Sequence, residues 1–218
     1  MKFLYWNTVI FFAFCMAQPA HAQQTLNGRW EGTAPIRKVV VNNSFSQSCL
    51  PSLSRAAARI NGVGAKFTLS YTNPSWTSYT GSSAPNNYAN TIIEAGTVSV
   101  PGRLAEVGYI MKTTAPTATS TGVPYFASAD MRVNRDILLY STGTAGGQFH
   151  CPSTAATTVP SEKYDMEYTF THELFHVAGL GHTNNTGCLM YTSQPLGSAT
   201  PVFCGDESGM LLNIYGRR

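Results

Sequence analysis

Residues 171–182, THELFHVAGLGH, constrain the fold of this chain more strongly than any other stretch. Each residue of an α-helix turns the side-chain direction by about 100°, which places His172, Glu173 and His176 on one side. Three apolar side chains point the opposite way: Phe170, Leu174 and Val177. The stretch therefore predicts a helix with one face in the core and the other in a cleft.

Gly179 stands where this helix should end. Glycine adopts the left-handed backbone conformation that closes a helix, so the chain can turn sharply there and bring His182 back toward His172 and His176. Two imidazoles four residues apart can bind one cation, and zinc is the ion that most often uses such a pair. We therefore expect His172, His176 and His182 to bind one catalytic zinc ion and to leave its fourth position to water.

A histidine-rich surface helix without metal is the simpler interpretation of the same residues. Typical residue frequencies give the pattern a chance occurrence on the order of 10⁻⁵, which disfavours that interpretation. The chain here resembles the metzincin zinc endopeptidases, whose signature H-E-x-x-H-x-x-G-x-x-H is matched from His172 to His182. The resemblance implies zinc-dependent hydrolysis of peptide bonds, with Glu173 as the general base.

The resemblance extends beyond the signature. The clan has a methionine turn beneath the metal, for which Met190 in CLMYTS is the candidate. Within the clan the chain is most similar to the matrixins, on Trp30, the helix from residue 53, ADMRV at 129–133 and the D-E-S-G…I-Y-G ending. The similarity implies an α+β fold with a twisted, mostly parallel sheet, an antiparallel edge strand, an active-site helix and a C-terminal helix.

The chain also departs from the matrixin pattern. No proline follows Tyr191, only His150 is left over for a second, structural zinc, and QSCLPS does not match the cysteine-switch motif. Some clan members place an oxyanion-binding tyrosine two residues after the methionine, where this chain has Thr192, so the oxyanion donor stays open. GGQFHC, at 146–151, is either the edge strand that pairs with substrate or an ordinary loop. Calcium binding stays open as well, although no dense run of aspartates marks a calcium loop.

The first residues have the composition of a secretory signal peptide. Lys2 precedes an apolar run that closes with the small-x-small sequence AHA, which predicts cleavage after Ala22. An uncleaved anchor is less suitable because the run is shorter than the roughly 20 apolar residues of a membrane span. Lipid attachment at Cys15 is disfavoured by the bulky Phe14. We expect a signal peptide at 1–22 and a zinc metalloprotease catalytic domain at 23–218, secreted to the periplasm or the cell exterior.

The charge of the chain after residue 22 is nearly balanced. It has 13 basic and 11 acidic side chains, a net charge of +2. This balance argues against nucleic acid or a membrane surface as a partner. The expected partner is a protein or peptide substrate, and the expected state is a monomer without stable membrane association.

Four cysteines follow the expected signal peptide: Cys49, Cys151, Cys188 and Cys204. An even number in an exported chain predicts two disulfides, with three possible pairings. The short separation favours Cys188 with Cys204, which leaves Cys49 with Cys151. A tetracysteine zinc site is the alternative, but no two cysteines have the C-x-x-C spacing of such sites.

Local composition predicts the remaining elements. Apolar and β-branched segments predict five strands, at 36–43, 65–72, 91–100, 105–114 and 129–141. Helix formers and end signals predict three helices, at 53–62, at about 162–178 with Ser161 as its N-cap, and at 206–216.

Two other functions are compatible with the zinc motif. One is a catalytically silent, zinc-containing binding or adhesion module of the same fold, and the other is hydrolysis of a non-peptide amide. Glu173 disfavours the silent module, because a purely structural zinc has no use for a carboxylate beside an open position.

Overall fold

The computed structural model describes residues 28–43, 45–72, 76–77, 90–113, 124–136, 148–155, 158–199 and 203–218. The expected signal peptide at 1–22 and residues 137–141 of the expected last strand lie outside these ranges. Within them, no helix has the length and apolar character that crossing a bilayer requires.

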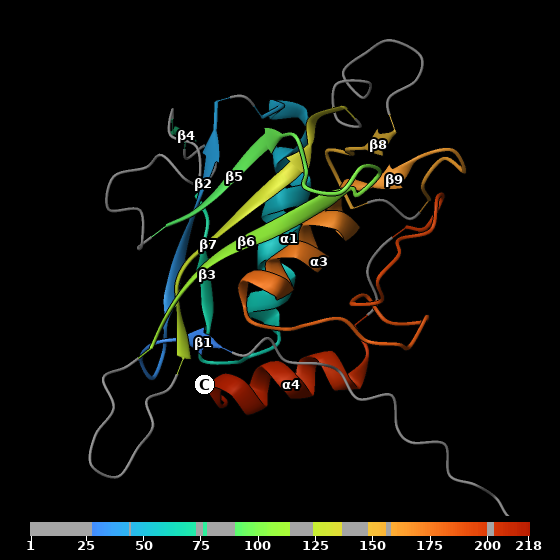
Figure 1. The fold of residues 1–218 in the computed structure, drawn as a ribbon. Helices are drawn as coiled ribbons and strands as arrows, with labels where there is room; N and C mark the ends of the chain where they lie inside the picture. Colours follow the sequence, from blue (N-terminus) through green and yellow to red (C-terminus); the bar gives the residue numbers. More distant parts are fainter. Residues whose placement is uncertain are drawn as a thin grey trace, which may run out of the picture.

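A curled, mostly parallel sheet forms one layer of the molecule (Figure 1). Its central strands are β2 (Ile36–Asn42), β5 (Asn90–Gly96) and β7 (Pro124–Asn134), which all run in the same direction. Three short strands join them in parallel: β1 (Arg29–Trp30) beside β7, and β3 (Thr68–Ser70) and β4 (Trp76–Thr77) beside β2. β6 (Ala105–Thr113) pairs antiparallel with β7 at the edge of this sheet. The expected mostly parallel sheet with an antiparallel edge strand is therefore present.

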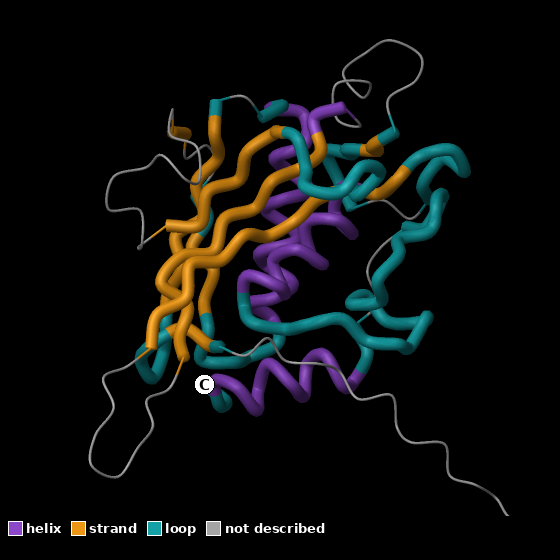
Figure 2. The backbone as a smooth tube through the Cα atoms, viewed as in Figure 1, coloured by secondary structure: helices purple, strands orange, loops and turns teal. Residues whose placement is uncertain are grey.

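Two helices cover one face of the sheet. α1 (Leu50–Gly62), preceded by the short η1 (Gln47–Cys49), lies beside α3 (Met166–Val177), and α4 (Gly205–Tyr215) crosses the lower end of the molecule (Figures 1 and 2). The core between the helices and the sheet includes these fully buried side chains: Leu53, Ile60, Ile93, Met131, Phe170, Leu174 and Val177. The predicted apolar face of the 171–182 helix is thus confirmed.

The beginning of α3 differs from the prediction. The helix begins at Met166 rather than near 162, and its N-cap is Asp165, whose carboxylate accepts a hydrogen bond from the Glu167 N–H at 3.0 Å. Ser161 is not the cap, because its hydroxyl lies against Glu162 instead. A carboxylate cap satisfies a helical N–H and also complements the positive end of the helix.

The residues before α3 form a small separate sheet. β8 (Phe149–His150) pairs in parallel with β9 (Tyr164–Asp165), and neither joins the main sheet. The described part of GGQFHC therefore does not supply the antiparallel edge of the main sheet, a place that β6 occupies.

Two disulfides have the pairing that the sequence favours. Cys49–Cys151 joins the beginning of α1 to the segment after β8, and Cys188–Cys204 joins the loop after α3 to the beginning of α4. Disulfides form and persist in oxidising compartments, so both bonds indicate such an environment.

Candidate metal centre

The chain reverses sharply at the end of α3. Gly179 has φ 98°, its N–H donates to the His176 carbonyl at 2.7 Å, and the Leu180 N–H donates to the Phe175 carbonyl at 3.0 Å. These two bonds are those of a Schellman helix end. A side chain at position 179 would place its Cβ 3.2 Å from the Gly28 carbonyl oxygen, so lack of space also favours glycine. The predicted turn at Gly179 is confirmed.

Two aromatic side chains fix the end of α3 from distant parts of the chain. Trp30, in β1, donates its indole Nε1–H to the Val177 carbonyl at 2.7 Å. The Tyr215 hydroxyl, at the end of α4, donates to the Ala178 carbonyl at 2.9 Å. Carbonyls at a helix end have no partner within the helix, so these bonds satisfy two of them and hold the turn in place.

The turn brings three imidazoles together. The Nε2 atom of His182 lies 3.2 Å from Nε2 of His172 and 3.1 Å from Nε2 of His176. The Nδ1 atoms of the two helical histidines face carbonyl oxygens, of Leu189 at 2.8 Å and of Leu180 at 2.7 Å. Since a carbonyl only accepts hydrogen bonds, each Nδ1 must carry the proton, and each neutral ring presents its Nε2 lone pair to the cluster.

This donor set fits a tetrahedral metal ion. Two nitrogen ligands about 2.05 Å from zinc lie about 3.3 Å apart in tetrahedral geometry. The measured separations of 3.1 and 3.2 Å are close to that value. His172, His176 and His182 could therefore hold one metal ion.

Burial keeps these histidines neutral. It lowers the pKa of His172 to about 4 and the pKa of His176 to about 3, and neighbouring histidines contribute in the same direction. Burial and then the positive charge of Arg103 lower the pKa of His182. Because a metal binds the deprotonated imidazole, such a cluster is ready to bind at neutral pH.

Glu173 lies beside the cluster as a buried carboxylate. Its side chain is 7% exposed, and its Oε2 atom has no hydrogen-bond partner in the part of the chain that the structure describes. Burial raises the pKa of Glu173 to about 8, although the positive charge of Arg103 acts in the opposite direction. Buried carboxylates are normally paired or hydrogen-bonded, so this oxygen is available to a group that enters the site.

The segment around Met190 lies next to the histidines. Met190 is fully buried, and the Leu189 carbonyl before it orients the His172 ring. The buried carboxylate of Glu207, in α4, accepts hydrogen bonds from the backbone N–H groups of Met190 and Cys204. Sequence reasoning missed Glu207, although its place three residues after a helix N-cap is that of a capping box.

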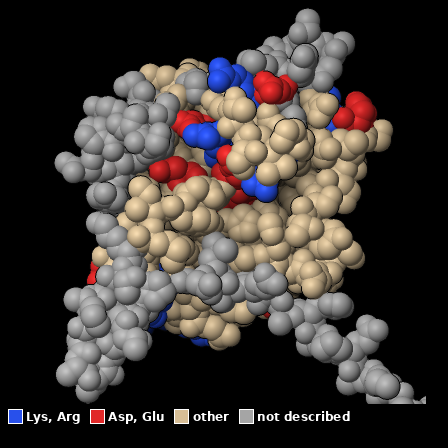
Figure 3. Space-filling model, viewed as in Figure 1, with Lys and Arg blue, Asp and Glu red and all other residues tan. Residues whose placement is uncertain are grey.

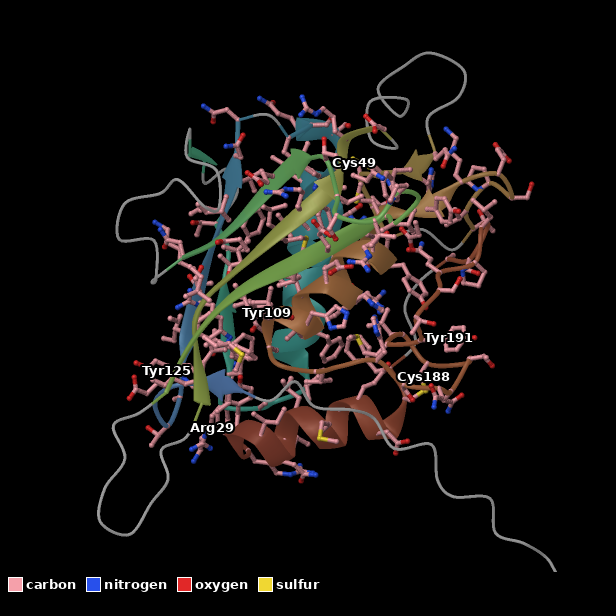
Figure 4. All side chains as sticks on the ribbon, viewed as in Figure 1. Arg29, Cys49, Tyr109, Tyr125, Cys188 and Tyr191 are labelled. Atoms are coloured by element: carbon pink, nitrogen blue, oxygen red, sulfur yellow. A yellow bond between two sulfur atoms is a disulfide. The ribbon has the colours of Figure 1, made fainter. Side chains whose placement is uncertain are left out.

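A cavity of about 640 Å³ contains the cluster. One wall comes from the turn before β6 and from β6 itself, and the other from the loop after α3. Tyr109, from β6, and Tyr191, from that loop, come to the cavity from opposite sides (Figure 4). The hydroxyl of Tyr109 is buried and, like Glu173 Oε2, has no hydrogen-bond partner among the described residues. Charged side chains on this face gather around its upper middle, while the lower right is uncharged (Figure 3).

Of the remaining predicted residues, one lines the cavity and one lies outside the cluster. Thr192 is exposed and lines the cavity together with Tyr191. His150 belongs to β8 and is not part of the three-histidine cluster, the one group of potential metal ligands found in the described ranges. No sequence pattern singled out Arg103 or Tyr109, which both line the cavity.

Comparison with known proteins adds no relative to these observations. No protein-family model matches the chain, and no curated protein matches it. What this centre does must therefore be argued from its residues and their geometry.

Proposed function

We propose that this chain is a secreted, zinc-dependent endopeptidase of the metzincin type, with a matrixin-like catalytic domain. One observation carries the proposal: three converging imidazole nitrogens and a buried carboxylate with an unpartnered oxygen share one cavity. A structural metal site has no need of such a carboxylate, whereas hydrolysis needs a base beside the reacting water.

The chain's own residues would hold the metal in a defined orientation. His172, His176 and His182 are the ligands, and the carbonyls of Leu189 and Leu180 fix two of the rings through Nδ1. A bound zinc ion would lower the pKa of water toward about 7 and polarise the carbonyl of the peptide bond.

Glu173 would move the proton. Its Oε2 atom accepts the proton of the attacking water and passes it to the leaving amine. A nearby cation favours the ionised carboxylate, so metal binding lowers the pKa of Glu173 from its value of about 8 and prepares it to act as a base.

Substrate backbone would pair with β6. Among the described residues, β6 has β7 as its strand partner on one side, and its first half lines the cavity. An exposed strand edge presents N–H and C=O groups that an extended peptide can bind. Tyr191 and Thr192 would lie on the opposite side of the bound peptide.

The decisive experiment is digestion of casein or gelatin by the purified mature chain with one equivalent of zinc, followed by mapping of the cut sites. We expect cleavage that a chelator abolishes and zinc restores. Glu173→Ala should keep one zinc per chain and lose cleavage, whereas Glu162→Ala, an exposed glutamate before α3, should keep both. Unchanged proteolysis by Glu173→Ala would rule out the assigned base.

The same experiment separates the other functions that the sequence leaves open. Cleavage of small amides without cleavage of protein would indicate a non-peptide amidase. Stoichiometric zinc without turnover of either substrate would indicate a silent binding module. Loss of zinc in His182→Ala but not in His150→Ala would support the three-histidine ligand set.

A further inference from the structure

Arg103 lies at the rim of the cavity, just before β6. Apart from the histidines, three charged side chains of the described ranges line this cavity: Arg103, Glu106 and Glu173. Glu173 already has a role in the proposed function. The other two therefore decide which charges the cavity offers to a bound peptide.

The carboxylate of Glu106 is already engaged in hydrogen bonds and ion pairs with neighbouring residues. Its carboxylate accepts hydrogen bonds from the N–H and the hydroxyl of Ser99, and it pairs with Arg103 at 3.3 Å and with Arg132 at 3.8 Å. Although burial opposes them, these contacts lower the pKa of Glu106. The carboxylate thus stays ionised and bound to groups of the protein itself.

The backbone of Arg103 is held firmly. Its N–H donates to the Val100 carbonyl at 3.2 Å, and its own carbonyl accepts from the Asn134 side-chain amide at 2.8 Å. The Asn134 N–H also donates to the Leu104 carbonyl at 2.9 Å. The end of β7 therefore fixes where the Arg103 side chain begins, which lowers the entropy cost of using it to bind a ligand.

The guanidinium of Arg103 is not saturated. Its side chain is 48% exposed, and among the described residues only Nη1 donates hydrogen bonds, at 3.3 Å to Glu106 and 3.4 Å to Ser99. A guanidinium has five N–H donors, so those on Nε and Nη2 remain available. Their planar arrangement matches the two oxygens of a carboxylate.

We propose that Arg103 is a specificity residue that binds a carboxylate of the substrate close to the cleaved bond. The inference rests on the proposed peptidase function and names its substrate class: peptides with an acidic side chain, or a free chain end, near the scissile bond. The cation of Arg103 attracts such a group, and the pairing of Glu106 with Arg103 and Arg132 weakens the repulsion between Glu106 and a bound carboxylate.

The test uses peptides built around a cut site mapped in casein. Each of the three positions on either side of the bond carries Glu or Gln in turn, with either an amidated or a free C-terminus. At one position we expect kcat/KM to be about fivefold to tenfold higher with Glu than with Gln. Arg103→Gln should abolish this ratio. Arg132→Gln is the matched control, because Arg132 also contacts Glu106 but does not line the cavity, and it should keep the ratio.

A binding measurement separates this inference from the peptidase proposal. Fluorescence anisotropy of the same labelled Glu and Gln peptides, with zinc-loaded Glu173→Gln protein, should show the same ratio in Kd. Equal rates and equal binding for every pair would overturn the inference and leave proteolysis intact. A preference that survives in Arg103→Gln would overturn it too. A preference seen only with free C-termini would support a carboxylate site and identify the chain end as its source.

Discussion

Two buried glutamates on the same helix, Glu167 and Glu173, have opposite surroundings. Glu167 is 2% exposed, and its two oxygens accept hydrogen bonds from Arg59 at 2.6 Å and Arg55 at 2.5 Å. Glu173 is 7% exposed, and its Oε2 has no hydrogen-bond partner within the described ranges. The first carboxylate joins α3 to α1, and the second faces the cavity.

The difference shows at which buried glutamate the fold is destabilised. Burying a carboxylate costs free energy unless cations or hydrogen bonds compensate it. The ion pairs with Arg55 and Arg59 offset this cost at Glu167. Glu173, which lies next to the three histidines, has no such ion pair among the described residues. An uncompensated ionisable group in a cavity is typical of a functional site rather than of a structural contact.

The largest expected effect is on catalysis. Glu173→Gln should lower kcat/KM for casein by about 10³-fold, because it removes the base but keeps the shape of the side chain. Glu167→Gln should leave kcat/KM within about threefold once the rate is divided by the folded fraction. Comparable losses in both variants would mean that the two glutamates do not differ in role.

The next effect is on stability, and here we expect the Glu167 variant to lose more stability than the Glu173 variant. Glu167→Gln should lower the free energy of unfolding by about 2–3 kcal/mol, since it removes the negative charge that both Arg55 and Arg59 contact. The loss stays at this level because both arginines are partly exposed to water. Urea denaturation measures it, with Glu162→Gln expected within about 0.5 kcal/mol of the wild-type protein.

The pH dependence of the metal-free protein sharpens the comparison. The pKa of Glu173 is about 8 in the fold against an ordinary value of 4.5, so between these pH values the folded protein keeps a proton that the unfolded chain releases. The contribution of Glu173 to stability therefore falls as pH rises through this window. Glu173→Gln does not titrate and should be more stable than the wild-type protein by about 4 kcal/mol at pH 8, because each pKa unit of difference is worth about 1.4 kcal/mol. Thermal unfolding should show that this gain disappears at pH 4.

A smaller effect concerns the turn that brings His182 to the cluster. Gly179→Ala should lower the free energy of unfolding by about 1–2 kcal/mol, because φ is 98° there and a Cβ would meet the Gly28 carbonyl. Gly187→Ala, in the same loop but with more open space, is the matched control and should change it little. If Gly179→Ala also weakens zinc binding in a competition titration, the turn positions the third ligand.

The smallest effect is expected at Tyr109. Its hydroxyl has no hydrogen-bond partner in the described part of the chain, so Tyr109→Phe should change the free energy of unfolding by less than about 0.5 kcal/mol. Tyr215→Phe should cost about 1 kcal/mol, because that hydroxyl donates to Ala178. An equal loss of unfolding free energy in the two variants would show that the Tyr109 hydroxyl makes a hydrogen bond as strong as that of the Tyr215 hydroxyl.

Several features could be read from the sequence because they depend on neighbouring residues. The side-chain directions of His172, Glu173 and His176 follow from the helical period, and the turn at Gly179 follows from the backbone freedom of glycine. The disulfide pairing followed from the short separation of Cys188 and Cys204. The beginning of α3 was not predicted correctly, since the pairing of β8 with β9 makes Asp165 the cap.

The sequence by itself therefore determined the chemistry of the helix, namely which side chains share its polar face and where it must end. Only the tertiary structure decided what surrounds that face. β6 rather than the described part of 146–151 is the antiparallel edge of the main sheet, Arg103 and Tyr109 line the cavity, and Glu207 reaches Met190. The physical reason is that these contacts join residues far apart in the chain, and sheet order and packing bring them together. Helical period and glycine conformation act within a few residues and leave a local pattern, whereas packing between distant segments leaves none.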